Sequence, residues 1–227
     1  MVKGSTSNSS FQKHQVDDYE RKRYRGLDQK LVDKKEQKIL RRLLKENKKD
    51  RMKILDVPSG YGRFSFLLLG KGASVVSCDL SFHMVKRTTE KLERAGNHFA
   101  VVADAKQGLP FKTDIFDGLL CMRFFHHLHH PEERKAVLEE FFRVSSIWVI
   151  LSYYRMNFFH SIQRILRSRL KKSQANIKMV HGQEFREEIK KTGFDIKKSH
   201  PLFRGIHAQH ILLLKKVRSL SGPNSSR

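Results

Sequence analysis

The fold of this chain is most constrained by one stretch, ILDVPSGYGRFSFLLLGKGASVVSCDLS, which spans residues 54–81. A short apolar run ends in Asp56, a turn containing Gly60 and Gly62 follows, and a second apolar run ends in Asp79. Continuous apolar runs are typical of parallel strands that are buried on both faces. The apolar segment between the two runs reads as a helix. The stretch therefore predicts a strand-turn-helix-strand unit whose two carboxylates lie at the same edge of a sheet.

The rest of the chain continues this alternation of strands and helices. Further strands are predicted at 98–104, 116–122 and 147–153, and Pro131 begins a helix with acids in its first turn. Two apolar segments near the end follow each other without a long helix between them, so we expect them to pair antiparallel. The sequence predicts an α/β, Rossmann-like, doubly wound and mostly parallel seven-stranded sheet with an antiparallel C-terminal strand.

Charge is distributed unevenly along the chain, which has a formal net charge of +23. The net charge is +9 over residues 1–53, +1 over 54–154, +9 over 155–204 and +4 over 205–227. Basic flanks of this kind attract nucleic acid, anionic lipid or an acidic small substrate, or they are a solvated surface without a partner. Charge alone leaves these alternatives open.

The cellular setting is predicted from the N-terminus and the cysteines. The segment MVKGSTSNSS lacks the apolar region of a secretory signal, and no apolar run approaches the roughly 20 residues of a membrane span. Cys78 and Cys121 both lie in predicted strands and read as buried, reduced thiols. We expect a cytoplasmic protein.

The predicted crevice at the carboxyl ends of the strands could take two classes of ligand. A dinucleotide would require a third glycine or alanine where this chain has Ser65, and the carboxylate of Asp56 would repel a pyrophosphate. A ligand with an amine at one end suits Asp56 better, and Asp79 suits the two hydroxyls of a ribose.

These residues resemble a known family, the class I S-adenosylmethionine (SAM)-dependent methyltransferases of the small-molecule, Methyltransferase-11-like type. LDVPSGYGRF resembles their first motif, with Pro in place of the more usual Gly, and VVSCDLS, ADAKQGLPF and FDGLLCMRFFHHL resemble the next three. The resemblance covers residues 30–215 and implies a methyltransferase fold with SAM as the cofactor. It also implies a division of the chain into a disordered basic tail (1–18), a single domain (19–217) and a second disordered tail (218–227). Within the domain it implies a helical cap (19–50), a cofactor-binding core (51–153) and a substrate-side helical insert (154–182).

The resemblance implies a role for each matching position. Asp56 lies near the ammonium of the cofactor, Asp79 accepts both ribose hydroxyls, and Asp104 accepts the adenine amine. Backbone or apolar contacts to the cofactor are implied for Pro58, Ser59, Gly60, Gly62, Leu80, Ala105, Met122 and Arg123. Each of the three acids has an alternative role, because Asp at a strand end often caps the next helix.

Candidate catalytic residues follow the fourth predicted strand. A general base is needed only if the acceptor keeps its proton at neutral pH, and His126 or His127 could serve because an unperturbed imidazole has a pKa near 6.5. The same pair is common in the small-molecule subgroup across unlike substrates, which argues against a specific role. No Cys, Asp or Glu stands at ligand spacing from these histidines, so we expect no metal.

The acceptor is left open among three functions. We expect methyl transfer to a small-molecule or lipid-like, anionic acceptor, with contact to an anionic membrane surface through the basic flanks. An RNA methyltransferase is the first alternative, although the fourth motif reads MRFFHHL and no RNA-binding module is recognised. A non-catalytic binding protein with the methyltransferase fold is the second.

Overall fold

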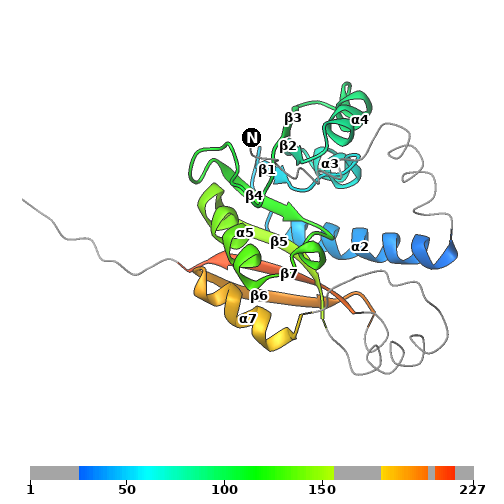
Figure 1. Ribbon diagram of the computed structural model, residues 1–227. Helices are drawn as coiled ribbons and strands as arrows, with labels where there is room; N and C mark the ends of the chain where they lie inside the picture. Colours follow the sequence, from blue (N-terminus) through cyan, green and yellow to red (C-terminus); the bar gives the residue numbers. More distant parts are fainter. Residues whose placement is uncertain (1–25, 156–179, 204–207, 218–227) are drawn as a thin grey trace, which may run out of the picture.

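The computed structural model describes residues 26–155, 180–203 and 208–217. Seven strands form one sheet in the order β3-β2-β1-β4-β5-β7-β6 (Figure 1). The parallel strands of its first part are β1 (Lys53–Asp56), β2 (Ser74–Asp79), β3 (His98–Val102), β4 (Phe116–Cys121) and β5 (Ser145–Tyr154). β7 (Gln209–Lys216) is antiparallel to both β5 and β6 (Phe194–Pro201), as the sequence predicted.

Helices cover both faces of the sheet (Figure 1). On one face, α2 (Leu27–Glu46) and α3 (Arg63–Leu69) bury leucines against Ile54, Trp148 and Leu213. On the other, α5 (Pro131–Val144), α7 (Gly182–Lys191) and the 3-10 helix η1 (Phe125–His127) pack against the strands. α4 (Phe82–Leu92) packs on β2 and β3. Two apolar clusters therefore sandwich the sheet, which is why the strands read as continuous apolar runs.

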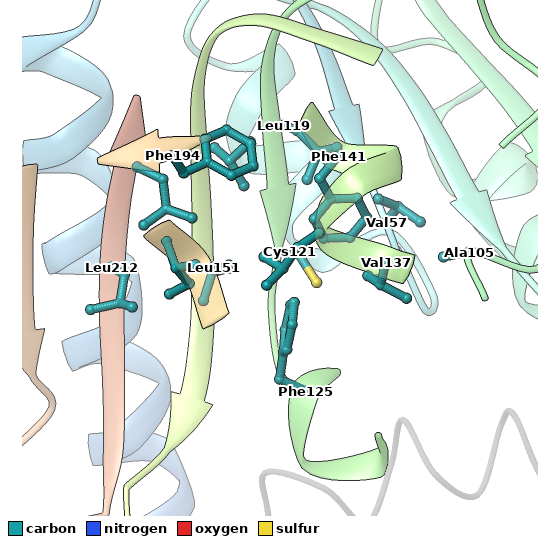
Figure 2. Close-up of a cluster of buried hydrophobic side chains, with 14 of the residues drawn as sticks. Val57, Ala105, Leu119, Cys121, Phe125, Val137, Phe141, Leu151, Phe194 and Leu212 are labelled. Carbon is teal, nitrogen blue, oxygen red and sulfur yellow. The ribbon is translucent and has the colours of Figure 1, made fainter. Parts of the chain in front are cut away.

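Figure 2 shows the cluster on the α5 and α7 face. Phe141 of α5, Leu119 and Cys121 of β4, and Leu151 of β5 are all fully buried there. Phe125 of η1 joins the same cluster and contacts the rings of Phe141 and Phe185 edge-on, with centroids 6.2 and 5.2 Å away. This burial anchors η1, and with it the loop that carries His126 and His127, at the carboxyl end of β4.

Local sequence signals explain several element boundaries. α3 ends at Leu69, directly before Gly70, and α5 begins at Pro131, as expected. Glu133 secures the start of α5 by accepting the backbone N–H groups of His129 and His130 at 2.8 and 3.2 Å. α4 ends at Leu92, and a turn follows before Gly96, which has a φ of +101°. The burial of both cysteines is as predicted.

Within the described ranges, none of the helices is long and apolar enough to cross a membrane. The tails 1–18 and 218–227 lie outside those ranges, as does most of the expected insert 154–182.

Candidate cofactor-binding site

The glycine turn after β1 is held in place by neighbouring elements on two sides. The backbone N–H of Ser59 donates to the carbonyl of Cys78 in β2 at 2.8 Å, and Gly62 N–H donates to the Ser59 carbonyl at 3.1 Å. Thr88 of α4 donates its hydroxyl to the carbonyl of Gly60 at 2.8 Å. The backbone of Gly60 and Gly62 has φ values of +56° and +81°, in the region that favours glycine.

Gly62 also meets a steric limit that Gly60 does not. A Cβ atom built on Gly62 would lie 2.7 Å from Cγ2 of Thr88, whereas one on Gly60 would have no neighbour within 4 Å. The turn therefore needs glycine at position 62 for both conformation and space, and the backbone at position 60 is left open to a ligand.

Asp79 fixes the turn from the end of β2. Its Oδ2 accepts the N–H of Gly60 and its Oδ1 accepts the N–H of Ser81, each at 2.9 Å. Burial raises the pKa of this carboxyl, although the backbone donors oppose the rise. The helix-capping role belongs to Ser81, whose side chain accepts the N–H of Met84. A carboxylate offers about four lone-pair sites, so Asp79 keeps acceptor capacity for a further ligand.

Asp56 is fully buried at the end of β1. Its Oδ2 accepts the hydroxyl of Ser65 at 2.6 Å, while its Oδ1 has no hydrogen-bond partner among the residues that the structure describes. Burial raises its pKa to about 7; the Ser65 hydrogen bond and Arg63 lower it, and the charge of Asp79 raises it further. A buried acceptor without a partner is costly, so this atom calls for a donor that the protein itself does not supply.

A chain of hydrogen bonds leads from Asp56 across two strands. Ser65, which occupies the position of the missing third glycine, lies 2.7 Å from the hydroxyl of Ser77 in β2. Ser77 in turn lies 2.8 Å from Nε2 of His98 in the edge strand β3. These hydrogen bonds connect the carboxylate of Asp56, beside the glycine turn, to the edge of the sheet formed by β3.

The remaining predicted positions have distinct surroundings. Leu80 is 48% exposed directly after Asp79, and Val102, which pairs in register with Asp79, is 46% exposed. Asp104 accepts the N–H of Lys106 at 2.9 Å, and Ala105 is buried. Met122 is buried in the α2 and α3 cluster. Pro58 lies inside the turn, between Val57 and Ser59.

Arg123 does not point freely into the crevice. Its backbone has a φ of +58°, and its guanidinium donates two hydrogen bonds of 2.8 Å to the carboxylate of Glu36 in α2. Glu36 is fully buried and also accepts from Arg63 at 2.8 Å and from Gln209 at 2.7 Å. Burial would raise the pKa of Glu36, but Arg123 and Arg63 outweigh burial and lower it.

This polar cluster was missed by the sequence analysis. It joins α2, the residue that follows Gly62, the loop after β4 and the start of β7. One signal was present, since Glu36 stands four residues from both Val32 and Leu40 on the apolar face of its helix. A carboxylate at such a position calls for buried partners.

His126 and His127 lie side by side on η1. Their ring centroids are 3.9 Å apart, and the ring of His126 also meets that of Tyr154 at 5.0 Å, edge-on. His126 is half-buried and His127 is exposed. Both lie at the carboxyl end of β4. Among the residues that the structure describes, no group of three or more His, Cys, Asp or Glu side chains is arranged to hold a metal ion.

The region just described is similar in sequence to known proteins. A family model described as a methyltransferase domain matches residues 54–146, which include the glycine turn and all three acids. Residues 54–146 are therefore similar in sequence to this methyltransferase domain. Glycine/sarcosine N-methyltransferase of Aphanothece halophytica is 31% identical over 94 residues, which are 40% of this chain and 36% of that protein. The chain thus spans about a third of the length of this curated relative.

Solved structures extend the likeness of the methyltransferase domain to most of the chain. Magnesium protoporphyrin IX methyltransferase of Synechocystis PCC 6803 with bound SAH has a TM-score of 0.74 at 19% identity, covering 88% of this chain and 94% of that one. A putative methyltransferase of Haloferax volcanii, in complex with the Trm112 methyltransferase activator, has a TM-score of 0.67 at 16% identity, covering 91% and 99%. At these identities the structures show that the fold is shared.

Proposed function

We propose that this protein is a SAM-dependent methyltransferase that acts on a small or lipid-like acceptor with a negative group. The observation that carries the proposal is a pair of carboxylates, the buried Asp56 and the half-buried Asp79, at the ends of adjacent parallel strands around an open glycine turn. The described residues fit SAM, which has a cationic amine, a ribose diol and an adenine to be recognised in turn.

The nucleoside end is assigned to the residues around β2 and β3. The lone pairs of Asp79 that are not used by its backbone donors would accept the ribose hydroxyls. Leu80 and Val102 are exposed apolar side chains beside it and would pack against the adenine. Asp104 would accept the adenine amine, with Ala105 next to it.

The methionine end is assigned to the glycine turn. Oδ1 of Asp56 and the hydroxyl of Ser59 are both buried without a protein partner. An ammonium, either directly or through a water molecule, would supply the donor that Asp56 lacks. Pro58, Gly60 and Gly62 would line this end with backbone, and Met122 and Arg123 would border it from the loop after β4.

Methyl transfer requires mainly that the protein position the two reactants. SAM, when bound, supplies a methyl group that its sulfonium has already activated. The protein then has to hold the acceptor in line with that methyl group and exclude water. His126 or His127 would act as general base only for an acceptor that is protonated at neutral pH.

The proposed anionic character of the acceptor rests on charge. The two flanks that border the core each have a net charge of +9, whereas residues 54–154 are nearly neutral. An acceptor with a negative group would be drawn to such a surface.

RNA is a second candidate acceptor, and one surface feature favours it. A groove of about 620 Å³ beside the glycine turn is lined by Tyr61 and Phe66 together with Arg41 and Lys91. Phe66 is 66% exposed, and aromatic faces among cations suit a stacked base. Binding of a short RNA that weakens steeply with salt and with Phe66→Ala would favour this candidate over the first.

Calorimetric titration with SAM tests the proposed function. The wild-type protein should bind, and Asp79→Ala should weaken binding by about 2 kcal/mol or more, the value of lost charge-assisted hydrogen bonds. Asp50→Ala is the matched control, because Asp50 is an exposed acid after α2 with no role in the proposed site. Absence of binding by a folded wild-type protein would contradict the proposal. Equal binding by both variants would contradict the role of Asp79.

A further inference from the structure

A second groove, of about 520 Å³, lies between α2 and the edge strand β6, away from the glycine turn. Its size falls in the range of ligand-binding pockets. One wall comes from α2 and the other from β6 and the residues directly after it. The lining residues are Lys35, Lys38, Ile39, Arg42, Ser199, His200, Pro201, Leu202 and Phe203.

The cations of the α2 wall follow from helical spacing. Lys35, Lys38 and Arg42 stand at i, i+3 and i+7, which places them in one stripe of the helix. The leucines at 40, 43 and 44 lie on another face and are buried in the core. α2 therefore presents a basic stripe to the groove while its apolar face packs against the sheet.

The positive charge is compensated at only one end of the groove. Arg42 shares Glu46 with Lys198, at 3.2 and 2.7 Å. Lys35 and Lys38 form no ion pair with any acid in the described part of the chain. The half of the groove nearer the start of α2 thus has two uncompensated cations.

The opposite wall is mainly apolar. Pro201, Leu202 and Phe203 lie in it beside Ser199 and His200, and Nζ of Lys35 lies 5.9 Å from the centre of the Phe203 ring. His200 has a buried Nε2 without a hydrogen-bond partner. Burial lowers the pKa of His200, and Arg42 and Lys198 lower it further against the opposing effect of Glu46, which favours the neutral imidazole. The wall could accept hydrocarbon and one hydrogen bond.

We propose that this groove binds an anionic amphiphile, namely an alkyl or prenyl chain with a phosphate head. Two unpaired lysines match a dianionic phosphate, for which lysine is a common ligand. The apolar wall matches the chain. A nucleic acid fits less well, because a single aromatic residue lines the groove and its ring already lies beside Lys35. This site is separate from the proposed cofactor site.

The test is titration with dodecyl phosphate, below its micelle-forming concentration. Wild type should bind it at least about tenfold more tightly than inorganic phosphate or dodecyl maltoside, since only dodecyl phosphate has both the charge and the chain. The double variant Lys35→Glu/Lys38→Glu should lose about tenfold or more in affinity through charge reversal. The control Lys48→Glu/Lys71→Glu makes the same charge change on two exposed lysines that do not line the groove, and should bind as wild type does.

Three results would overturn the proposal. The first is no binding of dodecyl phosphate, or equal losses in the two double variants. The second is inorganic phosphate binding as tightly as dodecyl phosphate, which would indicate a free-anion site. The third is a short RNA binding more tightly with the same dependence on Lys35 and Lys38.

Two further measurements keep the test independent of folding and of the proposed function. Methyl NMR signals of Ile39 and Leu202 in the wild-type protein should shift on titration with dodecyl phosphate. SAM titration of each double variant reports separately on the cofactor site, so failure of the groove and failure of the proposed function give different results.

Discussion

At the scale of single residues, the site is governed by Asp56, an acid that burial keeps from ionising easily. Its Oδ2 is bound by Ser65, and its pKa of about 7 lies well above the 3.8 of an unperturbed Asp. The folded state therefore retains a proton that the unfolded chain has already released between pH 4 and 7. This carboxyl contributes stability that is fully present below about pH 4 and is lost as the pH rises through 7.

Asp56→Asn should remove this pH dependence. In the absence of SAM, the free energy of unfolding of wild type should fall relative to that of the variant by roughly 4 kcal/mol between pH 4 and pH 7, and then level off. Urea unfolding of both proteins at half-unit pH intervals measures the difference. A constant difference across this range would show that Asp56 is ionised at its ordinary pKa in the folded protein.

Gly62 and Gly72 permit a test of the space beside the glycine turn. Both have a φ of +81°, but an added Cβ meets Thr88 only at position 62. Gly72→Ala should cost about 1 kcal/mol through backbone strain alone. Gly62→Ala should cost a further 1–3 kcal/mol, approximately, from overpacking and should weaken SAM binding. Thermal melts of both variants measure the loss of stability, and titration with SAM measures the loss of binding. Equal destabilisation of the two variants would contradict the steric argument.

At the scale of elements, hydrogen bonds of Glu36 hold the helix α2 against the sheet. This carboxylate bridges α2 to Arg63 at the start of α3, to Arg123 after β4 and to Gln209 at the start of β7. All four residues belong to different elements around the carboxyl ends of the strands. The cluster therefore fixes where α2 sits relative to the proposed cofactor site.

Glu36→Gln should lower the free energy of unfolding by about 3 kcal/mol, because it leaves two buried guanidiniums without their shared anion. Asp33→Asn is the control, since Asp33 is partly exposed and its partners are Arg63 and, one turn along the same helix, Gln37; a loss under about 1 kcal/mol is expected for it. Because the pKa of Glu36 is lowered on folding, its contribution should disappear as the pH falls below its unfolded value. Equal losses in urea unfolding at pH 7 would argue against a special role for Glu36.

Much of the fold could be predicted from the sequence, and less of the site. Apolar runs ending in Asp56 and Asp79 and Pro131 at a helix start are local signals, and each is confirmed. The partners of Glu36 come from segments up to 173 residues away, so no local pattern could identify them. Ser65 was read as a departure from a glycine pattern, and only the position of α3 beside the end of β1 reveals it as the partner of Asp56.

At the scale of the whole molecule, the net charge of +23 should make stability depend on salt. Like charges repel most in the compact state, and salt screens them over a Debye length of about 10 Å at 0.1 M. Raising NaCl from about 20 to about 300 mM should therefore raise the melting temperature by several degrees. Scanning calorimetry measures this, with KCl as a check for ion-specific effects. A falling melting temperature would mean that surface ion pairs such as Lys197–Asp195 outweigh the repulsion.

The hydrogen bonds that connect Asp56 through Ser65 and Ser77 to His98 form a series whose direction depends on which group donates at each step. Each hydroxyl has one proton to give. When Asp56 is ionised, Ser65 gives its proton to Asp56, Ser77 gives its own to Ser65, and His98 must then hold a hydrogen on Nε2. When Asp56 is neutral and donates instead, the order can reverse and His98 can take the other tautomer. An imidazole at the edge of the sheet therefore registers the protonation state of a carboxylate three hydrogen bonds away, and with it the arrival of any cation beside Asp56.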